Sequence, residues 1–151
     1  MPSAVSDLPD HLGYWLRLVS NHVSYAFARR LAARDVTVAE WAMMRALYGR
    51  KPMAPSRLAE TMGMTRGAIT KLADRLATKG LVTRETGEED RRTQTLRLTR
   101  KADTLVPELA AAADENDKEW FGRLRADERR DLERILKAMA ARLKLTAVPV
   151  D

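Results

Sequence analysis

The residues of this chain whose types best suit a chemical task lie at the start of one short helical segment. They are basic, hydroxyl-bearing or small, and they are Thr65, Arg66, Gly67, Ala68, Thr70 and Lys71. An Arg can hold a guanine through two hydrogen bonds, and a Thr can bond a base edge or a phosphate. The small residues would let a helix approach its partner closely. This group predicts contact with the DNA major groove, and the alternative is a solvated helix face.

The charge distribution supports a polyanionic partner for this part of the chain. The chain has 27 Lys and Arg against 21 Asp and Glu, for a net charge of +6. Between Arg66 and Lys101 there are ten basic and five acidic residues, which leaves +5, whereas all other residues together leave +1. Nearly all the excess positive charge therefore falls where a phosphate-facing surface would require it. Within this window, Arg75 and Lys79 suit either a phosphate contact or an ordinary surface position.

A predicted helix-turn-helix positions these residues. The first helix begins at Pro55, whose missing N–H costs nothing in a first turn, and closes at Gly63. Thr65 is a good cap for the second helix, which buries a stripe of Ile69, Leu72 and Leu76 and ends at Gly80. Two helices joined by a tight turn that contains a glycine form the helix-turn-helix pattern.

A predicted β-hairpin follows this pair of helices. Residues 81–84 (Leu-Val-Thr-Arg) have the composition of a strand, residues 87–92 form a polar turn, and residues 93–98 return as a second strand. A helix-turn-helix followed by a hairpin is a winged helix.

Long helices are predicted on both sides of the winged helix. Residues 9–33 carry one apolar stripe at steps of three and four, with Pro9 in the first turn. Thr37 and Glu40 have the spacing of a capping box that opens the next helix. Thr99 can cap a long helix after the hairpin, a final helix starts at about Asp127, and residues 146–151 are expected to fray. The apolar length of these helices exceeds what one small winged helix can cover, which favours burial between two chains.

Composition narrows the possible classes of function. A chain of 151 residues suits one ordinary domain. It has no cysteine, which excludes disulfides, thiolate metal sites and cysteine nucleophiles, and its remaining side chains show no metal-loop spacing. The sequence contains no apolar run of bilayer length and no secretory signal, so we expect a cytoplasmic protein. No catalytic motif or Gly-rich phosphate loop is present, and we predict a protein that is not an enzyme and needs no cofactor.

Together these features resemble the MarR family of bacterial winged-helix regulators. The resemblance rests on the order of the elements, on the segment TKLADRLATKGLV at residues 70–82, and on the wing residues Glu89-Asp90-Arg91-Arg92 followed by Leu96-Arg97-Leu98-Thr99. It extends from about Leu12 to Leu143. Two features depart from the family pattern: Arg125 stands where a Ser cap is common, and the absence of cysteine differs from the peroxide-sensing branch.

The resemblance implies a mainly α fold with a small β-hairpin wing. Residues 1–34 and 99–151 would form a helical dimerisation domain, and residues 35–98 a winged helix-turn-helix domain that binds DNA. Such a protein would be a homodimer on a pseudo-palindromic operator, usually a repressor, and in many relatives a small aromatic or phenolic effector releases the DNA.

The resemblance also assigns roles to individual residues. Arg92 at the wing would enter the minor groove, Asp90 would help to hold its side chain, and Arg91 would neighbour a phosphate. An Arg in a narrow minor groove gains from concentrated negative potential. The candidates for contact with an effector lie on the first two long helices, and they are His11, Tyr14, Trp15, His22, Trp41 and Met44. The alternative role for each of these six is in the core or the dimer interface.

Two other functions remain open at the level of sequence. One is a winged-helix module that binds another protein and has no DNA function. The other is a small enzyme of unrecognised type, which would need a convergent polar pocket.

Overall fold

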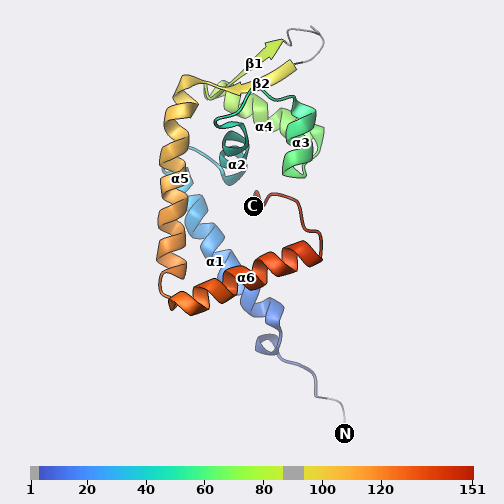
Figure 1. Cartoon of the computed structure of the whole chain (residues 1–151), viewed down its shortest axis with the longest axis vertical. Coiled ribbons are helices and arrows are strands. Elements are labelled where there is room, and N and C mark those ends of the chain that lie inside the picture. Colours follow the sequence, from blue (N-terminus) through green and yellow to red (C-terminus); the bar gives the residue numbers. More distant parts are fainter. Residues whose placement is uncertain (1–3, 87–93) are drawn as a thin grey trace.

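The computed structural model describes residues 4–86 and 94–151 and is mainly helical, with one two-stranded hairpin (Figure 1). A short 3₁₀ helix, η1, precedes the first long helix. The elements in chain order are η1 (Leu8–Asp10), α1 (Leu12–Ala32), α2 (Val38–Leu47), α3 (Pro55–Met62), α4 (Arg66–Thr78), β1 (Val82–Thr86), β2 (Gln94–Leu98), α5 (Arg100–Phe121) and α6 (Ala126–Arg142).

The predicted helix starts are confirmed where a side chain caps the backbone. The hydroxyl of Thr37 accepts from the backbone N–H of Glu40, and the Glu40 carboxylate accepts from the backbone N–H of Thr37, which completes the capping box of α2. The hydroxyls of Thr65 and Thr99 accept from the residues three positions on and start α4 and α5. Each cap satisfies a backbone N–H that the helix itself leaves without a partner.

The winged helix consists of α2, α3, α4 and the hairpin. The α3 helix ends at Gly63, whose φ of 65° lies in the left-handed region that glycine adopts readily, and the chain turns there into α4. Strands β1 and β2 pair antiparallel, with Val82 opposite Leu98. Met53, before α3, exchanges backbone hydrogen bonds with Leu96 and so ties the hairpin to the helices.

One apolar core holds these elements together. Ile69, Leu72 and Leu76 on α4 are buried, as their spacing predicts. They belong to a cluster that continues through α2 and α3 into α1 and α5, where Leu31 and Leu109 are fully buried. The winged helix therefore packs against one end of the long helices rather than standing apart from them.

The long helices α1 and α5 run side by side, and α6 crosses α1 at the far end of the molecule from the hairpin (Figure 1). The buried side chain of Asn116 on α5 donates to the carbonyl oxygen of Val23 on α1 at 3.2 Å. The Asn116 amide oxygen accepts from the Nε of Arg30 at 3.3 Å, and Arg30 also pairs with Glu119. These polar contacts link α1 to α5 in addition to the contacts of the apolar core.

A large apolar groove is left open between α1, the end of α5 and α6. Its volume is about 740 Å³. Leucine, isoleucine and methionine side chains on its walls are widely exposed, and they include Leu12 at 82%, Leu16 at 51% and Ile135 at 46%. Exposed apolar surface on this scale marks an interaction site in soluble proteins.

Two sequence expectations about the ends of the chain are wrong. Pro9 lies in the separate turn η1 instead of opening the first helix, because Asp7 caps η1 and the extended backbone of His11 interrupts the helical path. The segment 146–151 does not fray, since the backbone N–H of Val148 donates to the carbonyl oxygen of Met62 and Val150 packs on the core. The other element boundaries differ from the predicted ones by one or two residues.

Candidate nucleic-acid interface

The first half of α4 presents the predicted basic and hydroxyl-bearing side chains on its outer face. Arg66, Thr70 and Lys71 are exposed, and their neighbours Ile69 and Leu72 point into the core. Thr65 caps the helix through Ala68, and the Thr70 hydroxyl donates to the carbonyl oxygen of Arg66 at 2.9 Å. Gly67 is exposed, Ala68 is half-buried, and a Cβ at Gly67 would meet nothing within 4 Å. This half-helix is therefore open to the approach of a large partner.

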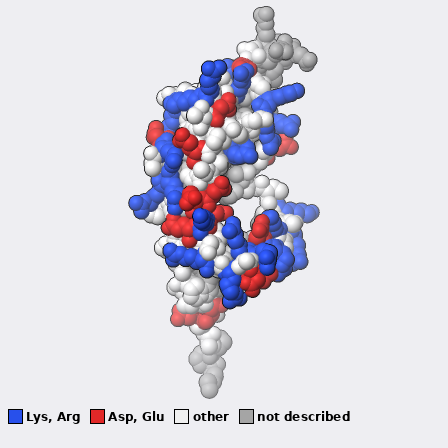
Figure 2. All heavy atoms as spheres, turned by 60° about the vertical axis from the view of Figure 1, so that its left-hand side comes forward, with Lys and Arg blue, Asp and Glu red and all other residues white. Residues whose placement is uncertain are grey.

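The basic side chains on this face have no ion-pair partner in the part of the chain that the structure describes. Among the residues that the structure describes, neither Arg66 nor Lys71 has a carboxylate within ion-pair distance. One turn further on, Asp74 pairs with Arg84 of β1, which joins α4 to the hairpin. Figure 2 shows Lys and Arg side chains at the winged-helix end of the molecule and a patch of acidic side chains across its middle. Cations beside the positive end of a helix dipole suit an anionic partner.

The second half of α4 is anchored to α2 by its two basic residues. The Arg75 guanidinium donates to the Thr37 hydroxyl at 3.1 Å and lies 3.5 Å from Oε1 of Glu40. The Lys79 ammonium donates to Oε1 of Glu40 at 3.1 Å and lies 3.0 Å from Oε2. Lys79 also donates to the backbone carbonyl of Asp35 at 2.6 Å. Arg75, a candidate for phosphate contact, thus has a partner inside the protein, although about half of its side chain remains exposed.

Glu40 is the fully buried anion at the centre of this anchor. Burial by itself raises the pKa of the Glu40 carboxyl, because the charged form loses its water. Hydrogen bonds from the Thr37 backbone N–H, the Lys79 ammonium and the Thr37 hydroxyl, together with the positive charge of Lys79, outweigh burial and lower the pKa below its ordinary value. Glu40 is therefore held in its charged form. Its capping role follows from the sequence, whereas its contacts with α4 do not.

The predicted wing contacts, Asp90, Arg91 and Arg92, lie outside the described residues. In the sequence they stand between β1 and β2, and the Asp74–Arg84 pair links β1 to α4.

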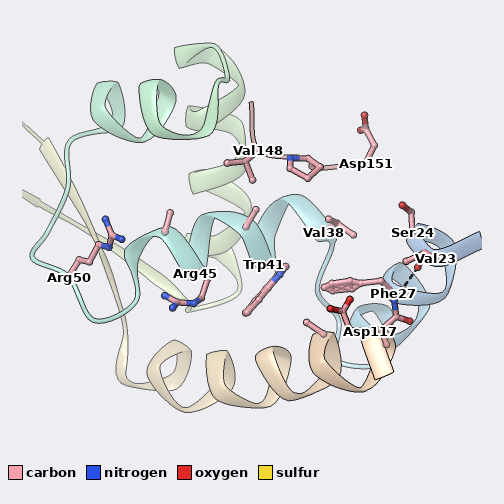
Figure 3. Close-up of a pocket in the computed structure, with 15 residues that line it drawn as sticks. Val23, Ser24, Phe27, Val38, Trp41, Arg45, Arg50, Asp117, Val148 and Asp151 are labelled. Atoms are coloured by element: carbon pink, nitrogen blue, oxygen red, sulfur yellow. Dashed lines mark hydrogen bonds between the residues drawn. The ribbon is translucent and has the colours of Figure 1, made fainter. Parts of the chain in front are cut away.

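A second candidate site is a cavity of about 640 Å³ between the winged helix and the long helices. Its walls come from α1, α2, α5 and the segment after α6 (Figure 3). Trp41 and Arg45 project from α2 toward α5, and Phe27 reaches in from α1 (Figure 3). Asp117 and Asp151 also line the cavity, as does Arg50. The cavity therefore combines aromatic side chains with guanidinium groups.

Of the six residues predicted to contact an effector, the structure places only Trp41 in this cavity. Met44 is fully buried in the core. Trp15 and His22 line the apolar groove of α1 and α6 instead, and Tyr14 packs edge-on against Trp15. His11 is exposed at the start of α1. Phe27, Arg45 and Arg50 also line the cavity but were not among the candidates, because helical spacing does not say which helices face each other across a cavity.

Within residues 4–86 and 94–151, His and carboxylate side chains do not gather into a group of three or more that would hold a metal ion. None of the described helices has the length and hydropathy that crossing a bilayer requires.

Residues 34–93 match the model of the MarR family. A cysteine-to-serine mutant of MarR from E. coli, solved in complex with operator DNA, is 25% identical with a TM-score of 0.76, and the match covers 89% of this chain and 99% of that one. BpsR from Bordetella bronchiseptica, whose DNA binding is regulated by 6-hydroxynicotinic acid, is 20% identical with a TM-score of 0.78 over 91% of this chain and 98% of that one. CouR from Rhodococcus jostii RHA1, bound to p-coumaroyl-CoA, is 21% identical with a TM-score of 0.73 over 90% and 96%.

Proposed function

We propose that this winged-helix protein of the MarR family binds operator DNA as a homodimer and represses transcription, with α4 as its recognition helix. One observation carries the proposal. Arg66 and Lys71 stand exposed on the first half of α4, without an ion-pair partner among the described residues, and the whole buried face of the same helix is fixed in the core. A well-packed helix with exposed cations at its start suits the major groove, where Arg66 would read a base and Lys71 would meet a phosphate.

The open apolar groove supports a homodimer. In a second copy the same groove offers a matching apolar face, and burying it twice would remove side chains such as Leu16 and Ile135 from water. We accordingly assign residues 1–34 and 99–151 to dimerisation and residues 35–98 to DNA binding. Dimerisation would place two recognition helices on half-sites about one helical turn apart.

The wing would complete the contact. Arg92 would enter the minor groove, steadied by Asp90, and Arg91 would neighbour a phosphate, while Thr65, Gly67, Ala68 and Thr70 would lie near the groove floor or the backbone. The position of β1 and β2 beside α4 supports this arrangement, because the described part of the hairpin and α4 lie at the same end of the molecule.

The cavity between the winged helix and the long helices is the site where we place a small-molecule effector. The aromatic rings of Trp41 and Phe27 suit a planar aromatic or phenolic body, and the guanidinium of Arg45 suits an anionic group on it. Since α2 forms one wall and packs on α4, filling the cavity would change the placement of the recognition helices. The DNA binding of BpsR is regulated by 6-hydroxynicotinic acid and CouR was solved with p-coumaroyl-CoA, so these two compounds are the first to test.

Selection of bound sequences from a pool of random duplexes tests the central proposal. We expect a pseudo-palindromic sequence to emerge and its affinity to fall steeply with salt, because several phosphates are neutralised on binding. If selection enriches no duplex and the affinity for DNA does not change with salt concentration, the proposal of DNA binding is contradicted. This outcome would favour a winged helix that binds another protein. Addition of 6-hydroxynicotinic acid or p-coumaroyl-CoA to the selected complex then tests for release.

A further inference from the structure

Glu40 is a buried charge whose partners come from the far end of the recognition helix. It lies in the first turn of α2, and its side chain has no exposed surface. A buried carboxylate must be compensated by positive charge and hydrogen bonds, because it has given up its water. Here the compensation comes from Lys79, with both carboxylate oxygens 3.0–3.1 Å from its ammonium, and from the backbone of Thr37.

This compensation constrains the position of α4. Lys79 is the C-cap of α4, and Arg75, one turn earlier, holds the Thr37 hydroxyl that also caps α2. Moving the end of α4 away from α2 would leave the Glu40 charge buried without its cation, which is far more costly than breaking a solvated ion pair. Lys79 is held from the other side as well, because the Lys101 ammonium donates to its backbone carbonyl at 3.0 Å.

The anchor and the proposed reading surface are on the same helix but at opposite ends. Arg66, Thr70 and Lys71 lie in the first half of α4, whereas Arg75 and Lys79 hold its second half. A small rotation or tilt allowed at the anchored end would be carried along the helix to the side chains that face the groove. Base contacts depend on such geometry, and non-specific attraction to phosphates depends mainly on charge.

We infer that Glu40 is the positioning residue of the recognition helix: it sets the tilt at which α4 meets a specific base sequence and touches no DNA itself. The inference rests on the proposed function, since it concerns how well the chain discriminates one duplex from another.

The variant Glu40→Gln separates this role from a simple charge effect. Gln still accepts the Thr37 backbone N–H and keeps the capping box, but it cannot neutralise Lys79. Removal of a negative charge alone should tighten binding to any DNA. A loss of alignment should instead weaken binding to the selected duplex by about tenfold, while binding to a scrambled duplex of the same length stays within about twofold.

Glu60→Gln is the matched control. It makes the same change of charge at an exposed position on α3 that has no ion pair among the described residues, so both affinities should stay as in the wild type or rise slightly. Hydrogen exchange without DNA adds an independent measurement. The amides of residues 75–81 should exchange about tenfold faster in Glu40→Gln and at the wild-type rate in Glu60→Gln.

The outcomes are distinguishable. If the wild type selects a duplex and Glu40→Gln binds that duplex as tightly as the wild type does, Glu40 does not position α4. An equal loss on the selected and scrambled duplexes also overturns the inference, because it reports a smaller folded fraction. If the wild type selects no duplex, the proposed function fails first. Should Glu40→Gln not fold, Glu40→Asp retains the charge but shortens its reach to Lys79, and the same loss of discrimination is expected.

Discussion

Ala147, in the segment after α6, lies directly against Gly63, the glycine that turns the chain from α3 into α4. A Cβ placed on Gly63 would lie 2.9 Å from the Cα of Ala147 and 3.0 Å from its Cβ. Next to this contact, the Val148 backbone N–H donates to the carbonyl oxygen of Met62 at 3.2 Å. The two sides of the contact are more than 80 residues apart in the chain, and the contact joins the segment after α6 to the helix-turn-helix (Figure 1).

Replacing Gly63 by Ala should destabilise the protein for two reasons. Gly63 has a φ of +65°, where a Cβ costs roughly 1–2 kcal/mol. The new Cβ would also overlap the backbone of Ala147, and overpacking of this kind adds about 1–3 kcal/mol. Urea unfolding of both proteins measures the sum as a change in the free energy of unfolding.

Gly49→Ala is the control for this prediction. Gly49 has a similar φ of +70°, but a Cβ there would meet nothing within 4 Å, so only the backbone cost applies. The loss at Gly63 should therefore exceed the loss at Gly49. Equal losses would mean that residues 146–151 do not rest on the turn in solution.

The apolar groove predicts a dimer that one charge can dissociate. Leu16 lies on α1 in the groove and is 51% exposed in the single chain. In the proposed dimer Leu16→Asp would bury an uncompensated carboxylate, and we expect the dissociation constant of the dimer to rise about thirtyfold or more. Sedimentation equilibrium at micromolar concentration measures it. Arg130→Asp, at an exposed position of α6 outside the groove lining, should leave the dimer intact, and a wild-type monomer would contradict the proposed interface.

Lys71→Ala should weaken binding to all duplexes by a similar factor. As the proposed phosphate contact, Lys71 would contribute charge rather than sequence discrimination, so the slope of log affinity against log salt should become shallower by about one unit per Lys. Fluorescence anisotropy titrations over a range of salt concentrations provide the slope. The comparable Lys137→Ala, on α6 and paired with Glu133, should keep the wild-type slope. A loss confined to the selected sequence would show that Lys71 reads bases instead.

Arg92→Ala should weaken binding to the selected operator by about 1–3 kcal/mol and leave the dimer intact. In the proposed complex this variant would remove an Arg from the minor groove, where the negative potential is concentrated. The same titration at fixed salt gives the affinity, and gel filtration gives the oligomeric state. An unchanged affinity would remove the wing from the binding mechanism.

The parts of the fold that could be predicted from the sequence are those that depend on residues close together in the chain. The caps Thr37, Thr65 and Thr99 act on backbone groups within three residues, so their spacing in the sequence identifies helix starts directly. The same holds for the buried stripe of α4, since 3.6 residues per turn place Ile69, Leu72 and Leu76 on one face. The order of the elements and the exposed first half of α4 were predictable for these reasons.

Contacts between distant residues were not predictable in this way. Sequence spacing alone leaves Arg75 and Lys79 equally suited to phosphate or solvent, and only the packing of α4 on α2 brings them to Glu40. The same applies to the cavity, where Trp41 was a candidate but Phe27 and Arg45 were not, because its walls come from helices that meet only in the folded chain.

The sequence by itself therefore determined the winged helix, the excess positive charge on it and the long amphipathic helices around it, because periodicity, capping and charge count are properties of neighbouring residues. Only the tertiary structure decided that Glu40 anchors the end of α4 and that residues 146–151 rest on Gly63. Each of these contacts joins segments more than 30 residues apart. The free energy that selects such contacts comes from burying charge and surface together, which no local pattern encodes.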